Sequence, residues 1–346
     1  MKKNGTKKNN LSIKRRVLKW IKKFFIIGMV GISLIVTVGI IYEKSAEYID
    51  NRKYTPPGQI INIDGHDMHI YSKGEGKATV VFASGWGIPC PYVEYYPLYN
   101  EISKQTRIAV YDRPGYGWSS ISKTPRDIDT ITEEVHELLE KSGAKPPYIL
   151  VGHSLASLEV LRFAQLYKDE VKGIVLIDAG NPEYYAQKTF DEDAASTLSL
   201  KSFLNKIGVI RLLFNNSPNF VDTVYAPRNN FSLVPEGLKE IDKAMYIRNM
   251  VNKNKHDEEN NIQINASKVV EFSKIGDIPL IILTSESEAN ELEWNNSQEA
   301  LKNWSTKSQQ RIIKGSNHNM HQYVPDIINK EILNILNNIE MKIIKP

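Results

Sequence analysis

Val151-Gly152-His153-Ser154-Leu155-Ala156 is the stretch that decides the fold of this chain. It follows an apolar run from Tyr148 that predicts a short buried strand, and it precedes a segment, ending at Leu166, that predicts a helix. A serine between a strand and a helix, with small residues beside it, indicates a sharp turn of the G-x-S-x-G type. The turn excludes bulky residues two positions before and after the serine, and Gly152 meets this requirement. Ala156 stands where the pattern has Gly, a departure of one methyl group.

Strands and helices alternate on both sides of this turn. Further strands are predicted over Thr79 to Phe82, Arg107 to Tyr111, Val171 to Ile177, Pro279 to Leu283 and Gln310 to Ile313. Helices are predicted over Ile128 to Leu139, closed by Gly143, over Ser297 to Trp304 and over Pro325 to Ile339. Asp64-Gly65, between two short apolar runs, predicts a β-hairpin. This alternation predicts the α/β class, with a mostly parallel central sheet and helices on both faces.

The predicted strands end in polar or glycine-containing loops. These loops carry Gly85-Trp86, Asp112-Arg113, Ser154, Asp178 and His318. The carboxyl ends of parallel strands meet at one edge of a sheet, and ligands bind there in α/β proteins. We therefore expect a single site at this edge, built from residues that are far apart in the chain.

Residues 181–275 interrupt the alternation. The segment is rich in Asn, Lys and Phe and contains helical pieces such as Lys239 to Asn249. We expect one domain over residues 59–346, with residues 181–275 as an insertion in it.

The N-terminus predicts a membrane anchor. Phe24 to Tyr42 is a run of 19 residues without a charge, and as a helix it spans roughly 28 Å, about one hydrocarbon core. A cleaved signal peptide and a buried helix are the alternatives, but the run is longer than a typical signal core. We expect a single-pass helix in the cell membrane, with residues 1–23 in the cytoplasm and the rest of the chain outside. Residues 43–58, which end in Pro56-Pro57-Gly58, predict a linker.

Charge is distributed unevenly along the chain. Ten of the 44 Lys and Arg residues lie in residues 1–23, which hold none of the 40 Asp and Glu residues. The remainder is therefore mildly acidic, and its composition predicts no nucleic-acid partner. The single cysteine, Cys90, excludes an intrachain disulfide and a zinc site built from cysteines.

From about Gln59 to Ile339 the chain resembles α/β-hydrolase-fold enzymes. The pieces that carry the resemblance are Ser84-Gly85-Trp86-Gly87, Tyr111-Asp112-Arg113-Pro114-Gly115-Tyr116-Gly117, Val151-Gly152-His153-Ser154-Leu155 and Gly315 to Pro325. The resemblance implies a cap domain after the strand that ends at Asp178, which fits residues 181–275. It also implies a serine nucleophile, an acid and a histidine as the catalytic residues.

Ser154 is the expected nucleophile and His318 the expected base. A serine hydroxyl is a weak nucleophile and needs an adjacent base. His318 lies in the last loop before the final helix, where the resemblance puts that base, and His321 is its rival. His153 directly precedes Ser154, but adjacent side chains point apart, so we interpret it as a packing residue. We interpret Cys90 as a passive residue.

Two carboxylates compete for the role of the acid. Glu288 lies near the usual family position, after the strand Pro279 to Leu283, whereas Asp178 lies at the end of the strand after the serine turn, a position used in some members such as haloalkane dehalogenases. Either would hold the histidine tautomer. We favour Asp178, because a strand end orients a side chain better than a loop with several glutamates does.

The backbone N–H groups of Trp86 and Leu155 are the expected oxyanion hole. Each such donor is typically worth about 3 kcal/mol in the transition state. We expect Asp112 and Arg113 to brace loops beneath the site, without a chemical role.

These expectations define a membrane-anchored serine hydrolase that needs no cofactor and no metal. Its substrate would be a small-molecule or lipid-like acyl compound, cleaved at an ester bond or, in an aminopeptidase-like reaction, at an amide bond. The apolar cap residues Phe203, Leu204, Leu212, Leu213 and Phe214 favour an apolar acyl group, although core packing explains them equally. The alternative is a catalytically silent binding or sensor protein on the same scaffold. The sequence leaves the oligomeric state open.

Overall fold

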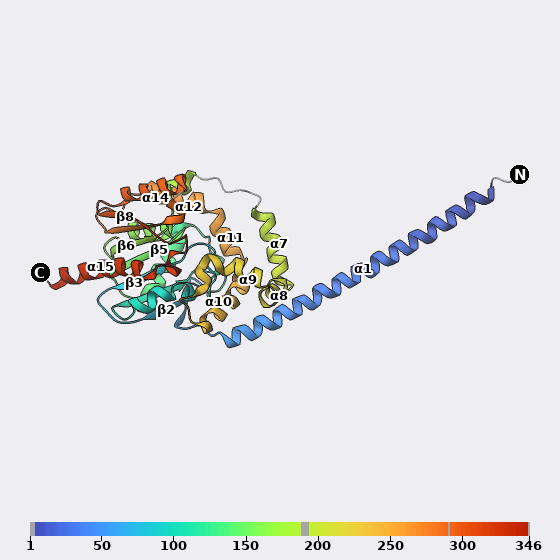
Figure 1. The fold of residues 1–346 in the computed structure, drawn as a ribbon, viewed down its shortest axis with the longest axis horizontal. Coiled ribbons are helices and arrows are strands. Elements are labelled where there is room, and N and C mark those ends of the chain that lie inside the picture. The colour runs from blue at the N-terminus through green and yellow to red at the C-terminus, as the bar shows by residue number, and fades with distance from the viewer. Residues whose placement is uncertain (1–3, 188–193, 290, 345–346) are drawn as a thin grey trace.

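The central element of the fold is a mostly parallel sheet (Figure 1). Within residues 4–187, 194–289 and 291–344, which the computed structural model describes, it has eight strands in the order β1-β2-β4-β3-β5-β6-β7-β8. The strands are β1 Gln59–Ile63, β2 His66–Lys73, β3 Thr79–Ala83, β4 Arg107–Asp112, β5 Tyr148–His153, β6 Val171–Ile177, β7 Leu280–Ser285 and β8 Ser308–Ile313. β2 pairs antiparallel with both β1 and β4, and every pairing from β4 to β8 is parallel. The predicted α/β class is confirmed.

Both faces of the sheet are covered, because the strands alternate buried side chains between two cores. One core joins the sheet to α4 Ile128–Ser142, α5 Ala156–Leu166 and α12 Ile262–Glu271. The other joins it to α3 Tyr96–Ile102 and α15 Pro325–Ile344. The remaining elements outside the insertion are α2 Pro91–Glu94, α13 Glu286–Ala289, α14 Leu292–Ala300, η2 Leu301–Trp304 and η3 Met320–Gln322.

Local sequence signals account for several of these boundaries. Asp64 and Gly65 both have positive φ, and they close the predicted hairpin between β1 and β2. Asp127 accepts a hydrogen bond from the Thr130 N–H at the start of α4, and Gly143 ends that helix in the left-handed conformation. The helix predicted from Ser297 begins earlier, at Leu292, as α14.

All of the regular structure in the described part of the insertion between β6 and β7 is helical. They are α6 Pro182–Gln187, α7 Ala194–Lys206, α8 Val209–Asn216, α9 Pro218–Tyr225, η1 Ala226–Phe231, α10 Glu236–Asn249, α11 Lys253–Asn260 and α12. We call residues 181–275 the cap. Three of its apolar residues, Leu204, Leu213 and Phe214, pack in its own core, whereas Phe203 and Leu212 are exposed. The buried Arg228 pairs with Glu94 below the cap and with Asp242 inside it.

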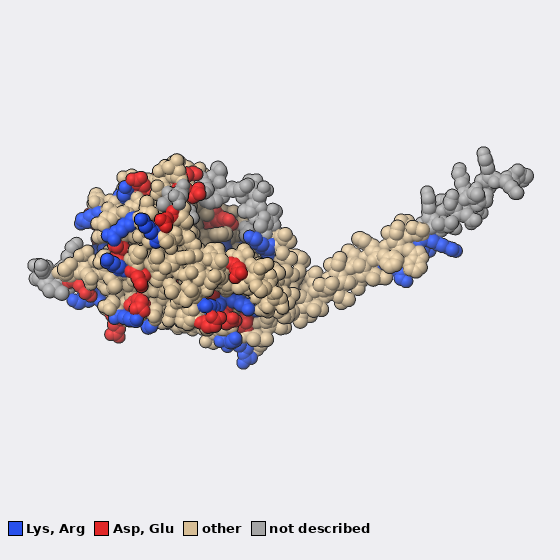
Figure 2. All heavy atoms as spheres, in the orientation of Figure 1, with Lys and Arg blue, Asp and Glu red and all other residues tan. Residues whose placement is uncertain are grey.

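The N-terminal segment is one long helix, α1 Asn4–Lys53, which projects away from the globular part (Figure 1). Its segment from Arg16 to Lys53 is long and apolar enough to cross a membrane, as a membrane anchor or a signal sequence would be. Figure 2 shows an uncharged surface along α1 between its basic N-terminal part and the globular body.

The linker predicted over residues 43–58 is mostly wrong. Residues 43–53 continue α1, and only residues 54–58 lie outside regular structure. The physical reason is that Glu43 to Lys53 contains no proline or glycine, so nothing ends the helix before Pro56-Pro57.

Candidate active site

Ser154 lies at the tip of the turn between β5 and α5. It has φ of 54°, which is the left-handed region that an L-residue enters only when the surroundings enforce it. A Cβ at Gly152 would approach Val160 Cγ2 to 2.9 Å, so the backbone there packs directly against α5. Ala156, the departure from the pattern, is the first residue of α5 and is buried, so its methyl group is accommodated in the core.

A chain of hydrogen-bond contacts joins Ser154, His318 and Asp178. His318 Nε2 lies 3.0 Å from Ser154 Oγ, and His318 Nδ1 lies 2.7 Å from Asp178 Oδ2. Asp178 directly follows β6 and is fully buried, whereas His318 lies in the loop after β8 and is partly exposed. The sheet therefore brings together three residues that the sequence predicted for one site.

The Asp178 carboxylate is held from its other side as well. Its Oδ1 accepts hydrogen bonds from the Ser285 N–H at 2.9 Å and from Gln298 Nε2 at 2.8 Å. Gln298, which lies on α14, is in turn fixed by Thr284 at 2.7 Å. The rival acid, Glu288, lies on α13, and its side chain is outside the described part of the chain.

The two neighbouring histidines have different surroundings from His318. His153 is buried, and its Nε2 lies 2.9 Å from the backbone carbonyl of His318. Burial and the neighbouring imidazoles hold the pKa of His153 well below its ordinary value, so the ring is neutral and its Nε2–H donates to that carbonyl. His321, the rival base, is fully buried and bonded to Glu94. His153 thus does more than fill space, because it supports the loop that carries His318.

The predicted oxyanion donors belong to two segments that adjoin Ser154. Leu155 directly follows Ser154 and is the N-cap residue of α5. Trp86 lies in the loop after β3, and its indole N–H donates to the Lys255 carbonyl at 3.0 Å. A Cβ at Gly85 would lie 3.1 Å from Ser154 Cβ, so only a glycine lets this loop approach the serine so closely.

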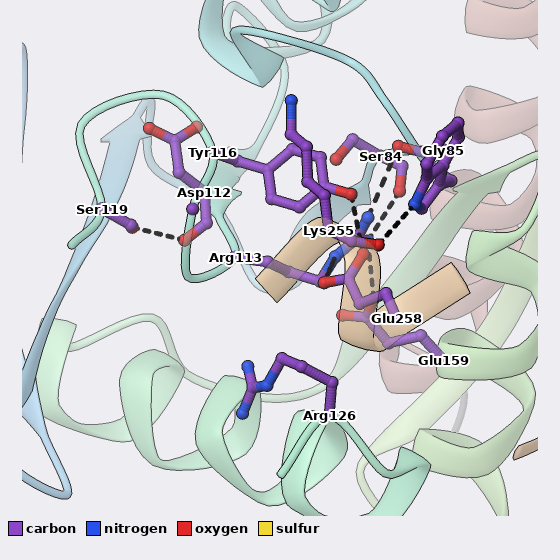
Figure 3. Close-up of polar contacts among 12 residues, drawn as sticks. Ser84, Gly85, Asp112, Arg113, Tyr116, Ser119, Arg126, Glu159, Lys255 and Glu258 are labelled. Carbon is purple, nitrogen blue, oxygen red and sulfur yellow. Dashed lines mark hydrogen bonds and ion pairs between the residues drawn. The ribbon is translucent and has the colours of Figure 1, made fainter. Parts of the chain in front are cut away.

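Arg113 fixes the loop that contains Trp86 (Figure 3). Its guanidinium donates to the backbone carbonyls of Ser84 at 2.7 Å and Gly85 at 3.4 Å. It also pairs with Glu159 on α5 at 3.0 Å and with Glu258 on α11 at 3.2 Å. The predicted bracing role is confirmed, and it connects three elements: the loop, the helix after Ser154 and the cap.

Asp112, the residue before Arg113, braces a second loop. Its carboxylate contacts His69 Nδ1 at 2.8 Å and accepts from the Trp118 N–H at 2.9 Å. All of these groups are buried. Asp112 therefore ties the loop after β4 to β2 beneath the site.

A cavity of about 160 Å³ lies beside the Trp86 loop, between it and the cap. Its lining includes Gly87, Lys201 and Lys255. The Lys255 ammonium lies 4.6 Å from the centre of the Tyr116 ring (Figure 3). Burial lowers the pKa of Lys255 to about 7, although Glu258 acts in the opposite direction.

Tyr185 is a site residue that the sequence did not reveal. It lies on α6, and its hydroxyl interacts with the Ser154 side chain; burial raises its pKa, and Ser154 acts in the opposite direction. A Cβ at Gly180 would overlap the Tyr185 ring, so the chain is closely packed here. Tyr185 also contacts Trp294 on α14, whose ring lies 6.3 Å from that of His318. No local motif marks a tyrosine in a cap helix.

Among the described residues, no cluster of three or more His, Cys, Asp or Glu side chains could hold a metal ion. Cys90 is buried, and burial raises the pKa of its thiol well above the ordinary value.

Strand order, the serine turn and the site at the carboxyl edge define the class, and the chain belongs to the α/β-hydrolase fold family, whose profile matches residues 79–322. The uncharacterized protein YbdG of Bacillus subtilis (strain 168) is 33% identical over 316 residues, which is 89% of this chain and 94% of that protein. Family membership supports a hydrolase.

Solved structures of other proteins share the fold, and two of them serve as examples. A bromoperoxidase from Bacillus anthracis has a TM-score of 0.58 and 23% identity, covering 79% of this chain and 96% of that chain. A thermophilic esterase from Thermogutta terrifontis has a TM-score of 0.55 and 16% identity, covering 81% and 99%.

Proposed function

We propose that this protein is a membrane-anchored serine hydrolase that cleaves an acyl ester or amide bond through an acyl-enzyme. The observation that carries the proposal is the continuous contact from Ser154 Oγ through both His318 nitrogens to the buried Asp178 carboxylate, at 3.0 Å and 2.7 Å. These distances suit transfer of a proton from a hydroxyl to an imidazole.

In the proposed reaction Ser154 Oγ attacks the acyl carbonyl carbon, and its proton passes to His318 Nε2. Asp178 accepts the Nδ1–H bond, which fixes the tautomer and stabilises the imidazolium. The N–H groups of Trp86 and Leu155 then donate to the oxyanion of the tetrahedral intermediate. His318 returns the proton to the leaving oxygen or nitrogen, and water, deprotonated by the same imidazole, releases the acid and regenerates Ser154.

The buried charges behind the site favour an uncharged acyl group. Glu159 and Glu258 pair with Arg113, and Glu94 and Asp242 pair with Arg228. These four carboxylates are already paired, so none of them is free to receive the ammonium group of an aminopeptidase substrate. We therefore place esters ahead of aminopeptidase substrates, and a panel of acyl esters and amides of graded chain length tests that order.

Membrane attachment is proposed from α1. Its apolar part matches one hydrocarbon core in length, and the basic residues before it favour a cytoplasmic N-terminus with the hydrolase domain outside. Protease treatment of intact cells tests this topology: digestion of the hydrolase domain is expected, and a protected domain would reverse the orientation.

Labelling with a fluorophosphonate probe tests the chemistry. Wild-type protein should be labelled, Ser154→Ala should not, and Ser157→Ala, which removes another buried hydroxyl three residues away on α5, should still be labelled. If folded wild-type protein takes no label, the hydrolase proposal is wrong and a silent binding scaffold replaces it.

A further inference from the structure

The cap contacts the part of α1 that is proposed to lie in the membrane. Partly or fully covered positions on α1 recur at helical spacing, at Val36, Gly39, Glu43 and Asp50. A Cβ at Gly39 would overlap the backbone carbonyl of Ile207, at the corner between α7 and α8. One face of α1 is therefore packed against the cap, and that face begins before the apolar run ends at Tyr42.

Buried ion pairs fix this contact. Arg211 on α8 binds both carboxylate oxygens of Glu43, at 2.8 Å and 2.9 Å, and Asp50 at 2.7 Å. Glu43 and Arg211 are both buried. A bidentate, largely desolvated pair holds two helices in one orientation more firmly than a surface ion pair does.

The contact fixes the position of the corner between α7 and α8 along the axis of α1, relative to the apolar run. Gly39 lies three residues before Tyr42, so at 1.5 Å per residue the contact with Ile207 is about 5 Å inside the end of the run. A Cβ at Gly208 would lie 2.8 Å from the Tyr42 ring, so the next corner residue faces the last residue of the run. The corner is therefore level with the end of the apolar run.

The surface of α7 and α8 fits this depth. Leu200, Phe203 and Leu212 are exposed by 60%, 49% and 49% of their surface. The exposed Lys201 and Lys206 stand beside them. Apolar side chains interleaved with lysines on short helices are typical of segments that lie in a membrane interface. Figure 1 shows α7 on the side of the cap that faces the N-terminal half of α1.

We propose that α7 and α8 lie in the interface of the lipid bilayer that holds α1, with Leu200, Phe203 and Leu212 inserted among the acyl chains. The inference rests on the proposed membrane anchor. The partner of this apolar surface is the bilayer itself, because the contact with α1 fixes the distance of these side chains from the apolar run.

This placement also indicates the source of the substrate. The cavity beside the Trp86 loop is lined by both Trp86 and Lys201, so it connects α7 with one of the two proposed oxyanion donors. A molecule that partitions into the outer leaflet can enter along this path with little exposure to water. We therefore assign the hydrolase a membrane-partitioned acyl ester as its substrate class.

Spin labelling of the full-length protein in vesicles of phosphatidylcholine and phosphatidylglycerol tests the docking. Cys90 is fully buried, so introduced cysteines can be labelled selectively. The test positions are Phe203→Cys and Leu212→Cys. Ile35→Cys reports the anchor itself, and Leu292→Cys on α14 is the aqueous control, exposed by 74%. The measurement is the ratio of collisions with oxygen to collisions with a water-soluble nickel chelate.

We expect the ratio at positions 203 and 212 to exceed that at position 292 several-fold and to fall below that at position 35. If the labels at 203 and 212 are as accessible to nickel as the label at 292 while position 35 is lipid-embedded, the docking is wrong and the anchor stands. If position 35 is also aqueous, the anchor and the docking are both wrong.

Kinetics test the substrate class separately. The double variant Phe203→Glu, Leu212→Glu should hydrolyse a long-chain ester in vesicles about tenfold more slowly, because charged side chains resist transfer into the interface, and should hydrolyse a short soluble ester at the wild-type rate. Equal loss on both esters would overturn the assignment. If wild-type protein hydrolyses neither ester and takes no fluorophosphonate label, the hydrolase proposal and this substrate class fall together, while the collision ratios still decide the docking.

Discussion

The carboxylate of Asp178 contacts the imidazole of His318 through Oδ2, at 2.7 Å from Nδ1. Its second oxygen is occupied by two further donors, the Ser285 N–H and the Gln298 side chain. Both oxygens of the carboxylate are therefore engaged by donors. An amide, which has only one oxygen, cannot reproduce this pattern.

Asp178→Asn should reduce kcat by about 10⁴ while the protein stays folded, as expected for a histidine held in the wrong tautomer. If the asparagine oxygen keeps the bonds from Ser285 and Gln298, its NH₂ group faces His318 Nδ1, and the proton moves to Nε2, where Ser154 needs an acceptor. Steady-state kinetics measure the effect. Glu288→Gln is the matched control, and a comparable loss there with little loss in Asp178→Asn would make Glu288 the acid.

His318→Gln should abolish fluorophosphonate labelling, whereas His321→Gln should retain it. His321 is bonded to the buried Glu94 and takes no part in the contact with Ser154. Weakening its bond to Glu94 should cost about 1–3 kcal/mol of unfolding free energy, which denaturant titration measures. Loss of labelling in folded His321→Gln would contradict the assignment of the base.

Arg113→Lys should lower kcat/KM about 10²-fold, the scale of loss from a small misplacement of reacting groups. Lysine keeps the charge but cannot bind the Ser84 carbonyl, Glu159 and Glu258 at the same time. The Trp86 loop then loses its support. Because Arg113 positions the loop and does not react, affinity for a boronic acid that mimics the tetrahedral intermediate should fall more than affinity for substrate.

Arg126→Lys is the control for that variant. Arg126 is also a buried arginine paired with a glutamate, Glu134 at 2.6 Å, but it stands apart from the Ser84–Gly85 loop (Figure 3). Both variants should melt at lower temperature, and only Arg113→Lys should lose boronate affinity. If Arg113→Lys and Arg126→Lys lose boronate affinity equally, Arg113 only stabilises the fold and does not position the Trp86 loop.

Lys255 should make stability rise with pH. Its pKa is about 7 in the folded protein, against an ordinary value of 10.5, so between these values the unfolded chain binds more protons and unfolding becomes less favourable as the pH rises. The unfolding free energy of wild type minus that of Lys255→Met should therefore increase from about pH 7 to about pH 10. Lys253→Met, an exposed change on the same helix, should give no such trend. A flat difference for Lys255→Met would show that its ammonium is solvated.

Ala156→Gly should leave kcat unchanged. The residue is buried at the start of α5, where its methyl group is accommodated without disturbing Ser154. Restoring the motif glycine should cost about 0.5–1 kcal/mol, because glycine loses more conformational freedom in a helix. Thermal unfolding and ester hydrolysis measure the two effects, and a large gain in kcat would mean that the methyl group strains the turn.

Much of the fold was predictable because local signals decide it. Asp64-Gly65 favours a tight turn in any context, and Gly143 ends α4 through its left-handed backbone. The continuation of α1 through Glu43 to Lys53 was missed for a different reason. That stretch is polar, and its helix is stabilised by packing against the cap, above all by Arg211, which lies far away in the sequence.

The residues of the site also fall into those that local sequence signals predict and those that only tertiary packing places. Ser154 and His318 could be placed from the turn and from the last loop, because strand ends fix them. The partners of Asp178 could not, since Gln298 comes from the middle of α14 and its side chain is aimed by Thr284. Tyr185 and the pair Arg113–Glu258 depend on how the cap sits on the core, and no pattern within either segment specifies that packing.

The unbroken helix from Asn4 to Lys53 has a consequence for how the protein would meet its substrate. Under the proposed anchoring, a continuous helix connects the membrane to the hydrolase domain, so Ser154 stays at a nearly fixed distance from the lipid. The active site then meets only molecules in a thin layer at the membrane surface. The rate at which substrate reaches it therefore depends on the number of substrate molecules per unit area of membrane and on their lateral diffusion. Diluting the surrounding medium would leave the rate of substrate encounter unchanged, whereas altering the lipid composition would change it.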